Sequence, residues 1–174
     1  MNENFELGNK NFIEKRIRKA IFVDKNSNIN SSEILLNNIR TLKISSDDCH
    51  SNMCILYFHG GGYVAGSPET HLGFLKQLYS QSKITIFAID YSLSPEKKFP
   101  NALNDSIESY NAINDLGYKP RDIIIGGDSA GGNLSLTCTL KLQDMKKELP
   151  SKLFLLSPWT DLTASGETIK LNAK

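Results

Sequence analysis

Cysteine is scarce in this sequence. Only three are present among 174 residues, and their spacing is not that of a zinc site: Cys49, Cys54 and Cys138. An odd number of widely spaced cysteines argues against a disulfide framework, so we expect three reduced thiols in a cytoplasmic protein that holds no metal. Cys54 and Cys138 fall in apolar segments and are expected in the core.

Long apolar runs and a strong charge imbalance are also missing. No segment approaches the roughly 18 consecutive apolar residues of a membrane-spanning helix. The first ten residues lack the basic and then apolar pattern of a secretory signal. The formal net charge is only +1, so composition gives no reason to expect nucleic acid or an anionic membrane surface as a partner.

What the sequence does contain is an alternation of short apolar runs and helical patterns. Continuous apolar runs suit parallel strands that are covered on both faces, and they occur at residues 54–58, 84–89, 122–126 and 152–157. Helix starts are marked between them by Ser67 as an N-cap followed by Pro68, and by Pro100. This alternation predicts an α/β fold with a doubly wound, mostly parallel sheet.

The first 50 residues follow a different pattern. Residues 10–19 form a basic patch with apolar residues at helical spacing, which predicts a solvated helix face or, alternatively, a helix that contacts a membrane or a partner. Residues 33–44 suggest two short strands of a hairpin. We therefore divide the chain into an N-terminal segment, residues 1–50, and a partial α/β domain, residues 51–174.

The first of two glycine-rich segments is F-H-G-G-G-Y-V-A-G, directly after a predicted strand. Gly60, Gly62 and Ala65 match the G-x-G-x-x-A pattern of a dinucleotide site, and Asp90 ends the next strand, where an acid would bind the ribose. In such a site, however, the helix begins within the glycine motif and holds the pyrophosphate at its N-terminus. Here the capping residues place the helix after the motif, which argues against nucleotide binding.

The second segment, G-G-D-S-A-G-G-N at residues 126–133, lacks the lysine of a Walker A loop. It fits G-x-S-x-G through Gly127, Ser129 and Gly131. This pattern is typical of a sharp strand-to-helix turn, in which the serine takes a strained conformation and its neighbours two positions away must be small. The alternative is a glycine-rich turn with an idle serine.

The two segments together favour acyl transfer over the idle serine. A tetrahedral oxyanion needs unobstructed N–H donors, and H-G-G-G supplies them. We expect Ser129 to be the nucleophile, with the amides of Gly61, Gly62 and Ala130 forming the oxyanion hole. The other motif residues are expected to support this geometry: His59, Gly60, Gly127, Asp128 and Gly131.

These motifs, in this order, resemble the hormone-sensitive-lipase-like family of α/β-hydrolases. Four segments carry the resemblance: residues 59–71, 91–105, 127–133 and 156–168. The resemblance implies hydrolysis of small or acyl esters without a metal or organic cofactor, and it implies that the N-terminal segment forms part of a lid.

The sequence departs from the family pattern at Ser92, where an arginine is usual. The resemblance also implies scaffold roles, and not catalytic ones, for Asp90, Pro95, Glu96 and Asp161.

A nucleophilic serine needs a base, and in this fold the chain order is serine, acid, histidine. No histidine occurs among the 45 residues after Ser129. We expect His59 to fix the glycine loop by hydrogen bonding, His71 to lie on a helix that leads away from the strand ends, and His50 to lie in a polar loop. The sequence is thus expected to be the N-terminal portion of an esterase, with its fold truncated after about the sixth strand.

Three functional hypotheses stay open at this point. The leading one is a serine carboxylesterase, and the others are a non-catalytic ligand-binding module and an inactive fragment. The expected partners are a small ester substrate and either a missing C-terminal half or a second copy that binds the edge strand at residues 152–157.

Overall fold

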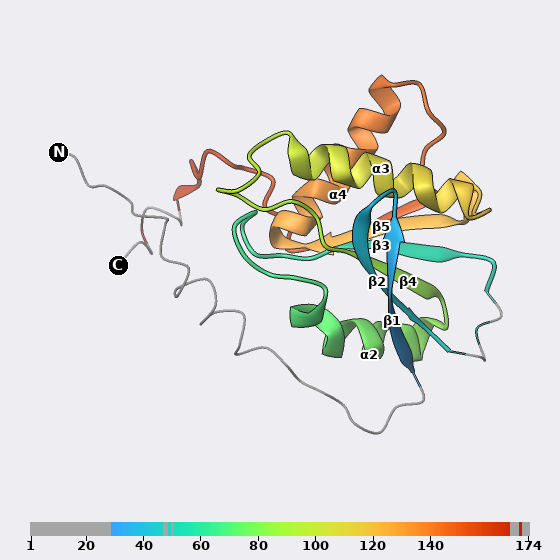
Figure 1. The fold of residues 1–174 in the computed structure, drawn as a ribbon. Helices are drawn as coiled ribbons and strands as arrows, with labels where there is room; N and C mark the ends of the chain where they lie inside the picture. The colour runs from blue at the N-terminus through green and yellow to red at the C-terminus, as the bar shows by residue number, and fades with distance from the viewer. Residues whose placement is uncertain (1–28, 47–48, 50, 168–170, 172–174) are drawn as a thin grey trace.

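The computed structural model describes residues 29–46, 49, 51–167 and 171. Its centre is a six-stranded sheet in the order β1-β2-β4-β3-β5-β6 (Figure 1). The strands are β1 (Asn30–Leu36), β2 (Ile39–Ser45), β3 (Cys54–Phe58), β4 (Thr85–Ile89), β5 (Ile123–Asp128) and β6 (Lys152–Leu156). The last four are parallel, and the β1–β2 hairpin joins them through antiparallel pairing of β2 with β4. The predicted fold class is confirmed, whereas the helix predicted for residues 10–19 lies outside the described residues.

Helices cover both faces of this sheet. Helix α2 (Leu72–Ser82) lies on one face, and α3 (Asn101–Asp115) and α4 (Ser129–Asp144) lie on the other (Figure 1). Successive side chains of β3 alternate between two cores, with Leu56 and Phe58 in the core that includes α3 and α4, and Ile55 and Tyr57 in the core that includes α2. Burial on both faces explains why the strands are continuous apolar runs. Among the described residues, no helix combines the length and apolarity that crossing a membrane requires.

The start of α2 differs from the expectation. Ser67 does not cap it, because a short 3-10 turn, η1 (Glu69–His71), comes first and α2 begins at Leu72. Ser67 and Thr70 bond to each other instead, with the Thr70 hydroxyl donating to the Ser67 carbonyl at 2.7 Å and the Ser67 amide donating to Thr70 Oγ1 at 3.1 Å. These local bonds compete with helix formation. His71 therefore lies at the junction of η1 and α2.

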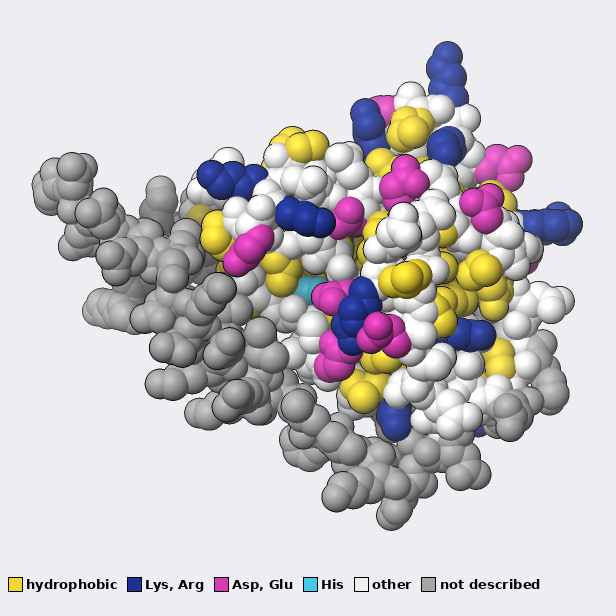
Figure 2. Space-filling model, in the orientation of Figure 1, with side chains coloured by type: hydrophobic (Ala, Val, Ile, Leu, Met, Phe, Trp, Pro, Cys, Tyr) yellow, Lys and Arg dark blue, Asp and Glu magenta, His cyan; other side chains and the backbone are white. Residues whose placement is uncertain are grey.

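Arg40 on β2 ties the hairpin to the rest of the domain. Its guanidinium contacts Glu33 on β1 at 2.8 Å, Asp90 after β4 at 3.0 Å, and Glu69 on η1. Figure 2 shows acidic side chains gathered around a basic one on this face. The cluster thus connects β2 to β1, to η1 and to the end of β4.

Strand β6 forms one edge of the sheet. It pairs with β5, and among the described residues no strand lies on its other side. Its side chains are half-buried or exposed, and Leu156 is 40% exposed.

The cysteines lie as predicted. All three are free thiols, and Cys54 and Cys138 are fully buried in the core.

Candidate active site

Ser129 occupies a sharp turn between strand and helix. Strand β5 ends at Asp128, and α4 begins at the next residue. The backbone φ of Ser129 is +50°, in the left-handed region that residues other than glycine rarely adopt. A Cβ added at Gly127 would lie 2.4 Å from the Phe58 carbonyl oxygen, and one at Gly131 only 1.9 Å from the same atom. Only glycine fits at these two positions, so the turn is pressed against the end of β3.

The register of the sheet brings the two glycine-rich loops together. Strands β3 and β5 are parallel neighbours, with Phe58 opposite Gly127. Their carboxyl ends therefore meet at the same edge of the sheet, where open α/β sheets bind their ligands. The loop at residues 59–66 leaves β3 directly beside Ser129.

This loop is folded so that two of its amides stay available. Gly61 and Gly62 have positive φ values of +134° and +65°, and the amides of Val64 and Ala65 both donate to the Gly61 carbonyl, at 3.1 and 3.0 Å. A Cβ at Gly61 would overlap the Ala65 carbonyl oxygen at 1.9 Å, so glycine is required there. Among the described residues, no acceptor pairs with the Gly61 or Gly62 amide.

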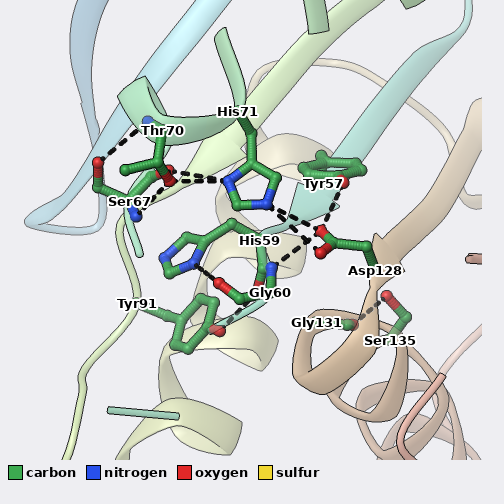
Figure 3. Close-up of polar contacts among 10 residues, drawn as sticks. All are labelled: Tyr57, His59, Gly60, Ser67, Thr70, His71, Tyr91, Asp128, Gly131 and Ser135. Carbon is green, nitrogen blue, oxygen red and sulfur yellow. Dashed lines mark hydrogen bonds and ion pairs between the residues drawn. The ribbon is translucent and has the colours of Figure 1, made fainter. Parts of the chain in front are cut away.

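Asp128 connects the loop to the turn (Figure 3). Its Oδ1 accepts hydrogen bonds from the Gly60 amide at 2.8 Å and from the Tyr57 hydroxyl at 2.7 Å, and it lies 3.3 Å from His71 Nε2. Burial alone would raise the pKa of Asp128, but the bonds from His71 and Tyr57 outweigh it and hold that pKa below its usual range. Asp128 is therefore an ionised acceptor at neutral pH.

His59 is buried inside the glycine loop. Its Nδ1 lies 2.8 Å from the Gly60 carbonyl, and its ring stacks on Tyr91 with centroids 4.4 Å apart. The Tyr91 hydroxyl donates to the His59 carbonyl at 2.6 Å (Figure 3). His59 Nε2 has no hydrogen-bond partner among the described residues, and burial lowers the pKa of His59 to about 4. The ring is therefore neutral at pH 7, with its Nδ1–H directed at the loop.

The expectation that His71 lies on a helix leading away from the strand ends is wrong, because His71 precedes α2 and lies at the site. The turn η1 precedes α2, and His71 lies against Asp128 (Figure 3). His71 also lines the same hollow as Ser129. Sequence reasoning missed this contact because the Ser67–Pro68 pair indicated an immediate helix start. His50 lies outside the described residues.

The two loops border an open hollow of about 510 Å³ whose lining includes Ser129, the glycines at 60–62 and His71. Ala130, the third predicted oxyanion donor, is buried in the first turn of α4. A second, apolar cavity of about 400 Å³ lies beside the first, between Tyr63, Asn133 and Leu162. Tyr63 and Asn133 close the gap between the loop and α4 through a 2.6 Å hydrogen bond.

A strained serine between a parallel strand and a helix, beside a glycine loop with available amides, defines the α/β-hydrolase architecture. The comparisons give the family: the sequence model for the alpha/beta hydrolase fold matches residues 55–174. The chain belongs to this family, in its hormone-sensitive-lipase-like branch.

Two named relatives and one solved structure illustrate the similarity. An esterase from Acinetobacter venetianus is 39% identical over 120 residues, which cover 69% of this chain and 40% of the relative. Mouse hormone-sensitive lipase is 34% identical over 125 residues, covering 70% of this chain and 16% of the lipase. The crystal structure of a hormone-sensitive lipase homologue from a metagenome library superposes with a TM-score of 0.83 at 34% identity, covering 92% of this chain and 54% of that one. The chain thus spans less than half the length of these two curated relatives and about half of that solved structure.

Proposed function

We propose that this chain carries the nucleophile and the oxyanion hole of a serine carboxylic ester hydrolase. One observation carries the proposal: the strained Ser129 shares a hollow with Gly61 and Gly62, whose amides have no acceptor among the described residues. This pairs a displayed hydroxyl with the donors that an oxyanion needs. The names of the relatives support ester hydrolysis as the reaction class.

In the proposed reaction, Ser129 Oγ attacks the carbonyl carbon of a small or acyl ester. The carbonyl oxygen becomes negatively charged and accepts hydrogen bonds from the amides of Gly61, Gly62 and Ala130. The alcohol leaves, the acyl group stays on Ser129, and water then releases it as the acid. The dipole at the N-terminus of α4 adds to the stabilisation of the oxyanion.

The proton of the Ser129 hydroxyl needs an acceptor, and neither described histidine bonds to Ser129. His59 Nε2 has an unpaired lone pair, but His59 is buried and does not line the hollow that Ser129 lines. His71 Nε2 faces the Asp128 carboxylate. In triad hydrolases, loss of the histidine costs on the order of 10⁶ in kcat, while the oxyanion donors retain roughly 10³–10⁴ over water. We therefore expect this chain by itself to hydrolyse esters very slowly.

A boronic acid tests the proposed site without depending on a base. The serine oxygen bonds to the boron of phenylboronic acid and the hydroxyl proton passes to the solvent, which leaves a tetrahedral anion. Boron-11 NMR reports that geometry. We expect an adduct with the wild-type chain, loss of the adduct in Ser129→Ala, and retention in Ser135→Ala, which removes another hydroxyl from the same helix. Equal signals from wild type and Ser129→Ala would reject Ser129 as the nucleophile.

Neither described histidine bonds to Ser129, and this favours one other function, a ligand-binding module that uses the same hollow without turnover. The two functions are separated by incubating the chain with an activated short-chain ester. Slow release of the alcohol that Ser129→Ala abolishes supports the esterase. Ester binding with identical background hydrolysis in both chains supports the binding module.

A further inference from the structure

The contacts around His71 point to a role for a histidine that the proposed reaction does not use. Its Nε2 lies 3.3 and 3.4 Å from the two carboxylate oxygens of Asp128. Its Nδ1 lies 2.8 Å from Thr70 Oγ1 and 3.3 Å from the Ser67 carbonyl. The Thr70 hydroxyl donates its own hydrogen to that carbonyl, at 2.7 Å, so its oxygen faces His71 as an acceptor. Both ring nitrogens therefore face acceptors, and only the doubly protonated ring can donate to both.

Asp128 belongs to one half of the site and bonds to the other. It immediately precedes Ser129 in the chain, and it holds the Gly60 amide at the start of the glycine loop. A Cβ at Gly60 would come within 2.1 Å of Asp128 Oδ2, so the loop packs against this carboxylate too closely for any side chain at position 60. The charge and position of Asp128 therefore help to set the distance between the nucleophile and the start of the loop.

We propose that His71, as an imidazolium, is a positioning residue that clamps the glycine loop to the nucleophile turn through Asp128. We call Gly60, Asp128 and His71 the aspartate clamp. The proposal rests on the proposed function, because the two parts that it holds are the proposed nucleophile and oxyanion hole. Charge-assisted hydrogen bonds are roughly twice as strong as neutral ones, so the clamp is tightest while both side chains are ionised.

The surroundings set the pH range of the clamp. Burial alone would lower the pKa of His71, but its bond with Asp128 outweighs burial and raises that pKa above its ordinary value. The other titratable groups nearby are Tyr57 on β3, neutral His59 at a centroid distance of 5.8 Å, and Glu69 on η1, which is paired with Arg40. The clamp is fully formed between the ordinary pKa of aspartate, about 3.9, and the ordinary pKa of histidine, about 6.5. It weakens as the pH falls through the lowered pKa of Asp128 and as the pH rises through the raised pKa of His71.

Nuclear magnetic resonance of the whole chain tests the charge on the ring. With carbon-13-labelled histidine, we expect His71 to titrate above about 6.5 in the wild type, and its pKa to fall in Asp128→Asn. Asp90→Asn is the matched control, because it removes a nearby carboxylate that bonds to Arg40 and not to His71, and it should leave the titration in place. A His71 that titrates at or below its ordinary value with Asp128 intact would overturn the proposal.

Hydrogen exchange of the Gly60 amide tests the positioning. His71→Phe keeps an aromatic ring without donors, and we expect it to speed Gly60 exchange about tenfold, as loss of one charge-assisted bond would. His71→Gln keeps a neutral donor. After correction for intrinsic exchange, protection of the Gly60 amide in this variant should not change between about pH 6 and 9, whereas in the wild type it should fall over that range. Equal, pH-independent protection in all three folded chains would refute the clamp. The readout involves no ester chemistry, so the clamp can stand or fall separately from the role of Ser129.

Discussion

Gly131→Ala is expected to destabilise the folded domain strongly, although it adds only one methyl group. The added Cβ would lie 1.9 Å from the Phe58 carbonyl oxygen and 2.6 Å from that of His59. The first distance is more than 1 Å shorter than any contact a real Cβ makes, and both atoms belong to the backbone at the end of β3, which cannot rotate away. Overpacking of this kind costs about 3 kcal/mol, the upper end of its usual range. For a chain of this size, that cost lowers the melting temperature by roughly 6–12 °C.

Gly132→Ala is the matched control, because both substitutions add the same methyl group to the same turn of α4 and gain the same helix propensity. At Gly132 the new Cβ would meet Pro158 at 2.9 Å, beyond β6, and not the end of β3. Circular dichroism melts of the two variants should differ by at least about 5 °C, with Gly131→Ala the less stable. Gly131→Ala should also bind the boronate more weakly, because it pushes the glycine loop from Ser129. Melting temperatures within about 2 °C of each other would refute the close packing of turn and strand.

Three further predictions concern activity, association and pH. Hydrolysis of an activated short-chain ester should be detectable but several orders of magnitude slower than a typical enzyme turnover of about 10 s⁻¹, and Ser129→Ala should remove it. Turnover at ordinary enzyme rates would reveal a base that we have not identified. The exposed edge of β6 should make the chain self-associate in sedimentation runs, and Leu156→Lys should shift the chain toward monomer. Unchanged association of Leu156→Lys would show that the edge of β6 is not the contact. Acidification from about pH 6.5 to 4 should destabilise the chain through His59, whose neutral form is the buried one; the folded state has the lower pKa, so stability is lost as the pH falls. His59→Phe keeps an aromatic ring that cannot be protonated, so the melting temperature of this variant should change less between about pH 6.5 and 4. A curve identical to that of the wild type would contradict the role of His59.

The sequence predicts the central strands well because burial on both faces leaves an unmistakable local pattern. Every residue of β3 and β4 is buried, so both strands read as unbroken apolar runs. The turn around Ser129 is equally readable, since its strained backbone requires glycines at fixed spacing. These features depend on residues near one another in the chain.

The position of His71 could not be predicted in the same way. The 3-10 turn that precedes α2 depends on bonds between Ser67 and Thr70, which compete closely with a helix start. The contact of His71 with Asp128 joins residues 57 positions apart, and no local pattern encodes it. The general rule that parallel strands end at one edge predicts which loops meet, but not which side chains of those loops touch.

The Arg40 cluster should tolerate substitution of any one of its acids better than substitution of its arginine. Three carboxylates share one guanidinium, so the loss of any one acid leaves two partners and relieves repulsion between the others. The loss of Arg40 instead leaves three acids facing one another at the point where β1, η1 and the end of β4 converge. Selection can therefore exchange Glu33, Glu69 or Asp90 one at a time, whereas the arginine is the single member on which the others depend.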